Sequence, residues 1–294
     1  MNIDLTSPAQ LKELLRRHNF YTKKRFGQNF LVDRNIVNKI LDAADVHEGD
    51  PVLEIGPGVG TVTQALAERG AKVVAVEIDR GLIAIMDEVV AGHPNVSVVN
   101  ADILSLDLPR FLRDHFGDVK VKVIGNLPYY ITSPIVGQAL GAYRQIDRLV
   151  MMVQKEVADR MKASPGTKAF GSMSVFVQFY AQPEIIAYVS KNVFLPPPDV
   201  SSAILRLTPH PEPPVDVPSE KLFFDVVHCA FGQRRKTLLN SLSDCPALGI
   251  GKEQVSQVLR AAGIDPSRRA ETLSLDDFAR IASGMPSGAP ESEP

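Results

Sequence analysis

An amide, a proline and an aromatic residue follow a hydrophobic run near the middle of this chain. Asn126-Leu127-Pro128-Tyr129 comes directly after the strand-like segment Val121 to Gly125. A side-chain amide oxygen and a backbone carbonyl can accept hydrogen bonds from both hydrogens of an exocyclic amine, while an aromatic ring stacks on the base that carries it. These four residues therefore predict a site that holds an adenine amine.

A glycine-rich turn precedes this segment by about seventy residues. Gly56-Pro57-Gly58-Val59-Gly60 follows the hydrophobic run Val52 to Ile55, and a helix-like segment starts at Thr61. Glycines allow a tight turn and a close approach of the backbone to a ligand. The spacing differs from GxGxxG, and Pro57 lacks the N–H that a pyrophosphate would use, so NAD is disfavoured. A purely structural strand-to-helix turn is the alternative.

Two acidic residues end the next two strand-like runs. Glu77 lies 23 positions after Glu54, where a carboxylate can accept both hydroxyls of a ribose. Asp102 follows the third run and could accept from an adenine amine. Each could instead cap the following helix. Taken together with the glycine-rich turn, the acids predict a nucleoside cofactor bound at the ends of three successive strands.

Short apolar runs alternate with helix-like segments between residues 52 and 153, which predicts a parallel sheet covered on both faces. Ligands bind such sheets beyond the carboxyl ends of the strands. Ser172 to Tyr180 and Ala203 to Leu207 also read as strands, and we expect an antiparallel pair at one edge. The expected strands are 52–55, 72–78, 96–100, 120–125 and 148–153, and the expected helices are 61–69, 80–91 and 133–143.

A proline-dense connector at 209–218 predicts a domain boundary, because it supports neither a helix nor a central strand. We expect an N-terminal helical segment at 1–20, the α/β domain at 21–208, and a smaller all-α domain at 219–284 in which Ser274 and Asp277 form a capping box. The tail, 285–294, is expected to be disordered. The helices expected in the second domain are 220–231, 233–242, 252–262 and 275–283.

The composition is that of an ordinary soluble protein, with 294 residues, 45% hydrophobic residues and a net charge of −2. The first residues lack the apolar core of a signal peptide and no long uncharged run occurs, so we expect a cytoplasmic protein without a membrane span. The scattered histidines predict no metal site, and we interpret Cys229 and Cys245 as reduced thiols. Short basic clusters form either a nucleic-acid face or solvated helix surface.

Several of these segments together resemble a known family. EIGPGVG at 54–60, Glu77, Asp102 and NLPY at 126–129 are joined by KKRFGQNFL at 23–31, VFLPPPDVSS and FGQRRKTLLNSL. In this combination the chain, from about residue 21 to 275, resembles the S-adenosylmethionine-dependent rRNA adenine dimethyltransferases that modify small-subunit ribosomal RNA. The resemblance implies a Rossmann-like class I methyltransferase sheet, mostly parallel with antiparallel edge strands, and a second all-α domain.

The resemblance also implies roles for individual residues. The QNFL segment would fold over the methyl donor as a lid, although it could also be a loop with a satisfied amide. Asn126 and the Leu127 carbonyl, stiffened by Pro128, would accept from the target amine, and Tyr129 and Phe194 would stack on its base. Core packing is the alternative for Phe194, and for Tyr130 we favour a ring buried in the core. The donor pocket would contain Gln28, Asn29, Leu31, Glu54, Gly56, Gly58, Glu77, Ile78, Asp102, Ile103 and Asn126.

The activity implied is dimethylation of the N6 amines of two adjacent adenosines in a 3'-terminal hairpin of 16S rRNA, within the 30S subunit or its precursor, by a monomer that releases S-adenosylhomocysteine. Alternatives are an antibiotic-resistance methyltransferase acting on 23S rRNA and a ribosome-assembly factor in which catalysis is secondary. An NAD oxidoreductase would need a hydride-transfer residue set that the sequence lacks. The predicted phosphate contacts are Lys23, Lys24, Arg25, Arg234, Arg235 and Lys236, the last three on a helix.

Overall fold

The computed structural model describes residues 3–21, 28–233 and 235–286. The described residues form two compact units: one within Met1–Ala158 and Ala181–Pro209, the other within Asp159–Tyr180 and His210–Pro294. The second unit thus includes Asp159–Tyr180, a segment that the sequence analysis placed in the first domain. Residues 287–294 of the predicted disordered tail, and the predicted phosphate contacts Lys23, Lys24, Arg25 and Arg234, lie outside the described residues.

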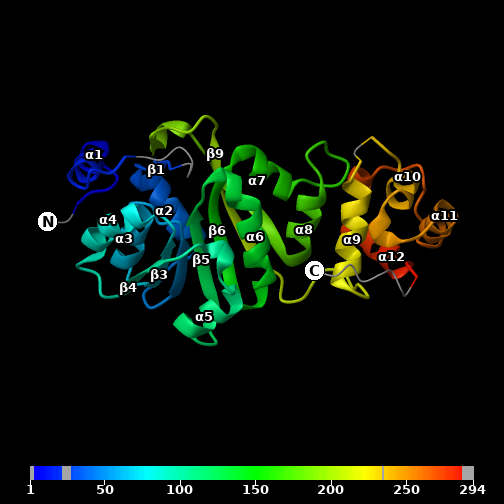
Figure 1. Cartoon of the computed structure of the whole chain (residues 1–294), viewed down its shortest axis with the longest axis horizontal. Helices are drawn as coiled ribbons and strands as arrows, with labels where there is room; N and C mark the ends of the chain where they lie inside the picture. The colour runs from blue at the N-terminus through cyan, green and yellow to red at the C-terminus, as the bar shows by residue number, and fades with distance from the viewer. Residues whose placement is uncertain (1–2, 22–27, 234, 287–294) are drawn as a thin grey trace. The chain divides into compact units, whose positions relative to one another are not determined.

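The first unit is built on a seven-stranded sheet in the order β4-β3-β2-β5-β6-β9-β7 (Figure 1). β2 to β6 run parallel, and β9 pairs antiparallel with both β6 and β7. This confirms the predicted mostly parallel α/β sheet with antiparallel edge strands. The strands are β2 (Pro51–Ile55), β3 (Lys72–Glu77), β4 (Val96–Asn100), β5 (Val121–Asn126), β6 (Ile146–Gln154), β7 (Ala181–Val189) and β9 (Ser202–Pro209).

Helices cover this sheet because its central strands are buried almost without interruption. One apolar cluster joins α2 and α3 to Ile124, Val150 and Ile204 of the sheet, and α6 packs against β6. The expected helices 61–69, 80–91 and 133–143 are confirmed to within two residues, whereas α2, α5 and α7 were not predicted. The helices are α1 (Pro8–Arg17), α2 (Arg34–Ala43), α3 (Thr61–Glu68), α4 (Arg80–Val90), α5 (Leu108–Phe116), α6 (Thr132–Gly141) and α7 (Lys155–Lys162).

Ser172–Tyr180 is a helix, α8, so its prediction as a strand is wrong. The β-branched and aromatic residues of this segment favour a strand locally. In the structure, however, Phe179 and Tyr180 pack on Phe223 and Phe224 of α9 (Glu220–Phe231), and this aromatic contact between helices overrides the local preference. The antiparallel edge pair is formed by β7 and β9 instead.

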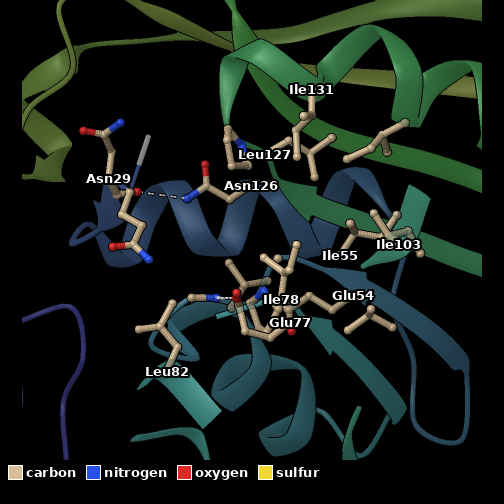
Figure 2. Close-up of a pocket in the computed structure, with 18 of the residues that line it drawn as sticks. Asn29, Glu54, Ile55, Glu77, Ile78, Leu82, Ile103, Asn126, Leu127 and Ile131 are labelled. Carbon is tan, nitrogen blue, oxygen red and sulfur yellow. Dashed lines mark hydrogen bonds between the residues drawn. The ribbon is translucent and has the colours of Figure 1, made fainter. Parts of the chain in front are cut away.

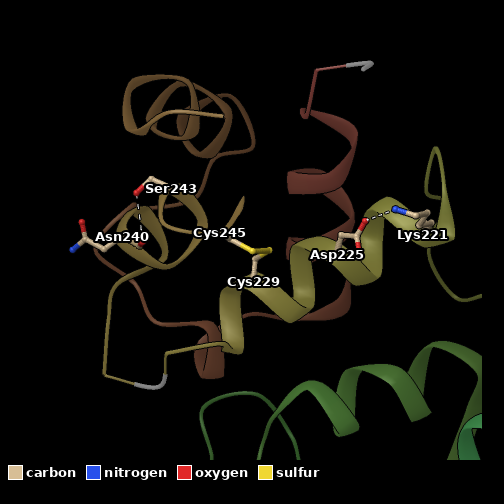
Figure 3. Close-up of a disulfide and its surroundings, with 6 residues drawn as sticks. All are labelled: Lys221, Asp225, Cys229, Asn240, Ser243 and Cys245. Carbon is tan, nitrogen blue, oxygen red and sulfur yellow. Dashed lines mark hydrogen bonds and ion pairs between the residues drawn. A yellow bond between two sulfur atoms is a disulfide. The ribbon is translucent and has the colours of Figure 1, made fainter. Parts of the chain in front are cut away.

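The second unit is helical, with α10 (Leu238–Ser243), α11 (Lys252–Ala261) and α12 (Leu275–Ser283) following α9. The capping box of Ser274 and Asp277 is confirmed. Cys229 and Cys245 form a disulfide with their Cα atoms 5.6 Å apart, so their prediction as reduced thiols is wrong (Figure 3). Their separation of 16 residues gave no sign of the pair, which the packing of α10 on α9 brings together.

Gly60 is the residue from which α3 starts, and it has a φ of 90°. A Cβ at this position would lie 2.8 Å from Sδ of Met86, a fully buried side chain, and 3.2 Å from Cγ1 of Val89. Gly49 has a similar φ of 81°, but a Cβ there would meet nothing within 4 Å. An alanine at Gly49 would therefore meet backbone strain alone, whereas an alanine at Gly60 would meet both backbone strain and steric crowding.

We predict that Gly60→Ala lowers the free energy of unfolding more than Gly49→Ala. Both variants place an alanine at positive φ, at a cost of roughly 1–2 kcal/mol, and only Gly60→Ala also crowds a packed core, at a further ~1–3 kcal/mol. Urea unfolding followed by circular dichroism measures both. Equal losses would show that Met86 and Val89 move aside without cost.

Candidate functional site

The strand order reverses between β2 and β5, and a pocket opens there. β2 leads outward to β3 and β4, and the chain then returns to β5 on the other side of β2. A crevice forms at such a reversal, outside the carboxyl ends of the strands. Ile55 lies opposite Gly125 in the register, so the glycine-rich turn after β2 begins beside Asn126 at the end of β5. The pocket is lined by segments 28–31, 54–59, 76–78, 101–104 and 126–131.

The structure brings together every residue predicted for the donor pocket and for the adenine site. All of them line one cavity, part of which is shown in Figure 2. These residues are Gln28, Asn29, Leu31, Glu54, Gly56, Gly58, Glu77, Ile78, Asp102, Ile103, Asn126, Leu127, Pro128, Tyr129 and Phe194. They come from six segments, each within, following or flanking a strand, and four of the six lie at or beyond the carboxyl ends of β2, β3, β4 and β5.

Asn126 is held by the segment that was predicted to form a lid. Its side-chain Nδ2 donates to the backbone carbonyl of Asn29 at 3.3 Å (Figure 2). Because the nitrogen is used in this bond, Oδ1 is the amide atom that can accept from a ligand. The lid is itself anchored: β1 (Phe30–Leu31) pairs with β8 (Phe194–Leu195), so that Leu31 lies opposite Phe194.

Glu77 organises the opposite wall of the pocket. Its Oε2 accepts from the N–H of Gly58 at 3.2 Å and its Oε1 accepts from the N–H of Asp79 at 2.8 Å. Asp79 in turn accepts from the Gln28 amide at 2.9 Å and caps α4 through Gly81. One chain of hydrogen bonds therefore links the lid, the acidic strand end and the glycine-rich turn.

Two buried carboxyl groups give the pocket an unusual charge balance. Glu54 is 3% exposed, and its Oε2 has no hydrogen-bond partner among the described residues. Burial, with a contribution from the neighbouring Glu77 carboxylate, raises the pKa of Glu54 to about 8. Burial also raises the pKa of Glu77, although the hydrogen bonds from Asp79 and Gly58 oppose it. A ligand with positive charge or hydroxyl donors would offset both penalties.

Asp102 and Ile103 lie on the loop after β4. The Asp102 carboxylate accepts from the N–H of Leu104 at 3.0 Å and thus caps the short helix η2 (Ile103–Ser105), so that the capping alternative holds while the residue also lines the pocket. Gln138 of α6 fixes this loop by donating to the carbonyls of Ile103 and Leu106 at 2.9 and 2.8 Å. No motif pointed to Gln138.

The aromatic residues of the site differ in how firmly they are held. The Tyr129 hydroxyl forms a 2.7 Å hydrogen bond with Ser202 Oγ, and burial raises the pKa of Tyr129 against that bond. Phe194 is 4% exposed and belongs to the apolar core as well as to the pocket wall. Tyr130 is 62% exposed at the pocket, so its prediction as a core ring is wrong. It follows Tyr129 into the short helix η3 (Tyr129–Ile131), which turns the next side chain outward.

Sequence reasoning missed part of the apolar lining and the supporting contacts. Leu104, 39% exposed, joins the predicted Ile78, 51% exposed, as an accessible apolar side chain just beyond a strand end. Such residues are visible in sequence only as an apolar residue one or two positions after an acidic strand end. The further lining residues without a predicted role include Ile55, Leu82, Ala101, Ile131 and Ile135.

Arg235 and Lys236 precede α10, which begins at Leu238, so the prediction that they lie on a helix is wrong. Arg235 is exposed, and Lys236 forms an ion pair with Asp244 at 2.7 Å. Within the described part of the chain no group of His, Cys, Asp and Glu side chains could hold a metal ion. None of the helices described there is long and apolar enough to cross a membrane.

Comparison with known proteins identifies the family of this chain. The model of the ribosomal RNA adenine dimethylase family matches residues 19–285. The chain belongs to this family, whose members are rRNA adenine methyltransferases.

Relatives of known name are similar to this chain over nearly its whole length. The chain is 48% identical to ribosomal RNA small subunit methyltransferase A of Alkaliphilus metalliredigens, over 94% of this chain and 96% of the relative. It is 45% identical to the protein of the same name in Geobacillus thermodenitrificans, over 97% and 98%.

Two solved structures share the fold. A dimethyladenosine transferase from Plasmodium falciparum has a TM-score of 0.72 at 25% identity, covering 85% of this chain and 95% of that chain. The 23S rRNA methyltransferase ErmE has a TM-score of 0.67 at 29% identity, covering 87% and 99%.

We predict that Glu54→Gln raises the free energy of unfolding increasingly as the pH rises from about 5 to 8. In the folded protein the pKa of Glu54 is about 8, well above its ordinary value, because the carboxyl is buried. The raised pKa therefore contributes its full stabilisation at any pH below the pKa that Glu54 has in the unfolded chain. As the pH rises from there to about 8, the free energy of unfolding falls by roughly 1 kcal/mol per pH unit. The glutamine of Glu54→Gln does not titrate, so position 54 of that variant adds no such pH dependence to the free energy of unfolding.

Urea unfolding at several pH values measures this difference. Glu48→Gln, which alters an exposed carboxylate of the same unit, is the control and should show no such trend. A difference between Glu54→Gln and the parent protein that stays constant from pH 5 to 8 would contradict a raised pKa at Glu54.

Proposed function

We propose that this protein transfers methyl groups from S-adenosylmethionine to the N6 amines of two adjacent adenosines in a 3'-terminal hairpin of 16S rRNA, within the 30S subunit or its precursor. The observation that carries the proposal is the Asn126 amide, whose nitrogen is bound to the Asn29 carbonyl so that its oxygen is left to accept from an amine. The names of the relatives of 45–48% identity support the small-subunit substrate.

The pocket suits the methyl donor. When bound, S-adenosylmethionine supplies a methyl group made electrophilic by its positive sulfonium. Glu54 and Glu77, whose buried carboxyls are costly to ionise without a cation, match this positive charge and the hydroxyl donors of a ribose. Gly58 suits a tight turn at the ligand, because its φ is 62° and a Cβ there would crowd the Phe30 ring at 3.2 Å.

The other donor-pocket residues fit the same ligand. Ile78 and Ile103 offer apolar contacts to an adenine ring, and Asp102 lies beside them with its second carboxylate oxygen left to accept from an amine. Gln28, Asn29 and Leu31 close over the ligand from the lid, and Gly56 lets the turn approach it.

The target amine would be held by Asn126 and its neighbour. The lone pair of an aromatic amine is delocalised into the ring, so acceptors aimed at its two hydrogens favour the nucleophilic geometry as charge develops. We assign these acceptors to Asn126 Oδ1 and the Leu127 carbonyl. An amide does not take up a proton at neutral pH, so the proton released after transfer goes to solvent.

Tyr129 and Phe194 would hold the flipped adenine between them. The hydrogen bond to Ser202 fixes the Tyr129 ring, and Phe194 is fixed by β8. Stacking on an aromatic ring is worth roughly 1–3 kcal/mol per base, which offsets much of the cost of unstacking the base. The phosphates of the RNA would be contacted by basic residues, namely Lys23, Lys24, Arg25, Arg234, Arg235 and Lys236. We propose a monomer that acts in the cytoplasm.

The similarity to ErmE leaves 23S rRNA as a second candidate substrate. Mass mapping of rRNA from cells that lack the protein separates the two. Loss of dimethyladenosine from 16S rRNA supports the proposal, and loss from 23S rRNA alone contradicts it. Unchanged modification of both, with a defect in 30S assembly, would instead favour the assembly-factor alternative.

We predict that Asn126→Ala reduces kcat for methyl transfer by roughly 10²-fold or more, the usual cost of removing a hydrogen bond that acts in the transition state. Donor binding should remain detectable, because Glu77 and the glycine-rich turn are intact. Transfer of labelled methyl to unmodified 30S subunits measures kcat, and the thermal shift caused by S-adenosylhomocysteine measures binding. Asn192→Ala, at an exposed amide outside the pocket, is the control. Near-normal turnover of Asn126→Ala would remove this amide from the mechanism.

We also predict that Arg235→Ala with Lys236→Ala weakens RNA binding and flattens its salt dependence. Each phosphate contact adds a slope of roughly 1 to the plot of log K against log salt. Because Lys236 is already paired with Asp244, Arg235→Ala alone should account for most of the change. Arg110→Ala on α5, which leads into the amino end of β5, is the control. An unchanged salt slope would exclude this segment from the RNA interface.

A further inference from the structure

Exposed apolar side chains gather at and beside the pocket. Three of the large ones, Ile78, Leu104 and Tyr130, line it directly. Two more lie near Ser202, the hydrogen-bond partner of Tyr129. Val200 is two residues before Ser202 in the chain, and Tyr188 lies opposite the next residue, Ala203, in the register of β7 and β9. The exposed large apolar side chains among the described residues are Tyr21, Ile78, Leu104, Val119, Tyr130, Tyr188 and Val200. An accessible apolar surface of this kind marks a binding site more often than chance exposure does.

Tyr188 lies at the same end of the sheet as the pocket. Val189, the residue after it, is opposite Ser202 in the register of β7 and β9. Across the sheet, Asn126 is opposite Met152, Met152 is opposite Ile204, and Ile204 is opposite Ala187. Three strand spacings of about 4.8 Å place the backbone beside Tyr188 about 14 Å from Asn126.

A cation accompanies this ring. Lys155 Nζ lies 5.1 Å from the centroid of the Tyr188 ring, which is 57% exposed. Lys155 is the first residue of α7, and its backbone N–H donates to the carbonyl of Ser201 at 3.0 Å, so its main chain is fixed beside Ser202 while its side chain is exposed. A cation over an exposed tyrosine is held weakly, so the ammonium can turn to a phosphate without large cost.

We propose that Tyr188 and Lys155 form a subsite for a nucleotide that flanks the target adenosine: its base stacks on the Tyr188 ring and its phosphate pairs with the Lys155 ammonium. The proposal rests on the proposed function, because it takes the ligand to be the same RNA strand that delivers the adenosine. Proteins that bind single-stranded nucleic acid combine aromatic rings on which bases stack with cations that contact the backbone. Stacking tolerates any base, so the subsite adds affinity without reading sequence.

The test compares Tyr188→Ala, Tyr188→Phe and Lys155→Ala in methylation of unmodified 30S subunits. We expect Tyr188→Ala to raise KM for the RNA substrate roughly tenfold, with kcat and the thermal shift by S-adenosylhomocysteine unchanged. Tyr188→Phe, which keeps the ring, should behave as the parent protein does. Lys155→Ala should raise KM and lower the salt slope of RNA binding by about 1. Val119→Ala, at an exposed apolar residue of the turn before β5, is the control.

Three results would overturn the subsite. These are an unchanged KM in Tyr188→Ala, a rise in KM that Tyr188→Phe shares fully, and a loss of thermal stability or donor binding that accompanies the rise in KM. The last would show a structural role or a protein-binding surface rather than a nucleotide contact.

A separate measurement distinguishes failure of the subsite from failure of the proposed function. Binding of a fluorescent single-stranded oligoribonucleotide requires no turnover and no particular ribosomal subunit. If the parent protein does not methylate 16S rRNA, the proposed function fails, but Tyr188→Ala should still weaken oligoribonucleotide binding relative to Tyr188→Phe. Equal binding by these two variants contradicts the subsite whatever the substrate proves to be.

Discussion

The pairing of β2 with β5 is the constraint on which the site depends. These parallel strands are adjacent although about seventy residues and two other strands separate them in the chain, and their register places Ile55 opposite Gly125. The glycine-rich turn and Asn126 therefore emerge side by side, about one strand spacing of 4.8 Å apart. Gly125 allows a close approach at this point, because a Cβ there would lie 2.9 Å from the Leu127 side chain and 3.3 Å from the Ile55 carbonyl oxygen. The register is supported at the start of β5, where the buried Lys122 ammonium binds the Asp45 carbonyl and the Asp50 carboxylate.

The pocket combines apolar walls with carboxyl groups that are costly to ionise. Glu77 meets this cost partly by accepting from two backbone N–H groups, whereas Glu54 keeps an unpartnered oxygen among the described residues. A buried polar atom without a partner lowers stability. Under the proposed function, the positive charge of the bound methyl donor would offset the cost of ionising Glu54.

In the second unit a disulfide restrains a segment that carries an exposed basic residue. The disulfide between Cys229 and Cys245 joins α9 to the turn after α10, and the basic segment lies within the loop that it closes (Figure 3). A closed loop of this length has fewer conformations in the unfolded chain, which stabilises the fold. Arg235 is exposed in this segment, so the frame holds it in place without burying it.

The sequence by itself determined the five parallel strands β2 to β6, the glycine-rich turn, the acidic strand ends and the NLPY segment, because each depends on residues that are neighbours in the chain. It also indicated that the glycine-rich turn, Glu77, Asp102 and Asn126 lie near one another, since parallel strands bring their carboxyl ends to one edge. The lid residues were assigned to the same pocket by the family resemblance. Tertiary structure alone decided the rest. Aromatic packing on α9 turned 172–180 into a helix, the approach of α9 and α10 paired two cysteines 16 residues apart, and η3 directed Tyr130 to the surface. The hydrogen bond from Asn126 to Asn29 joins atoms 97 residues apart. Such contacts depend on how elements meet in space, which no local pattern encodes.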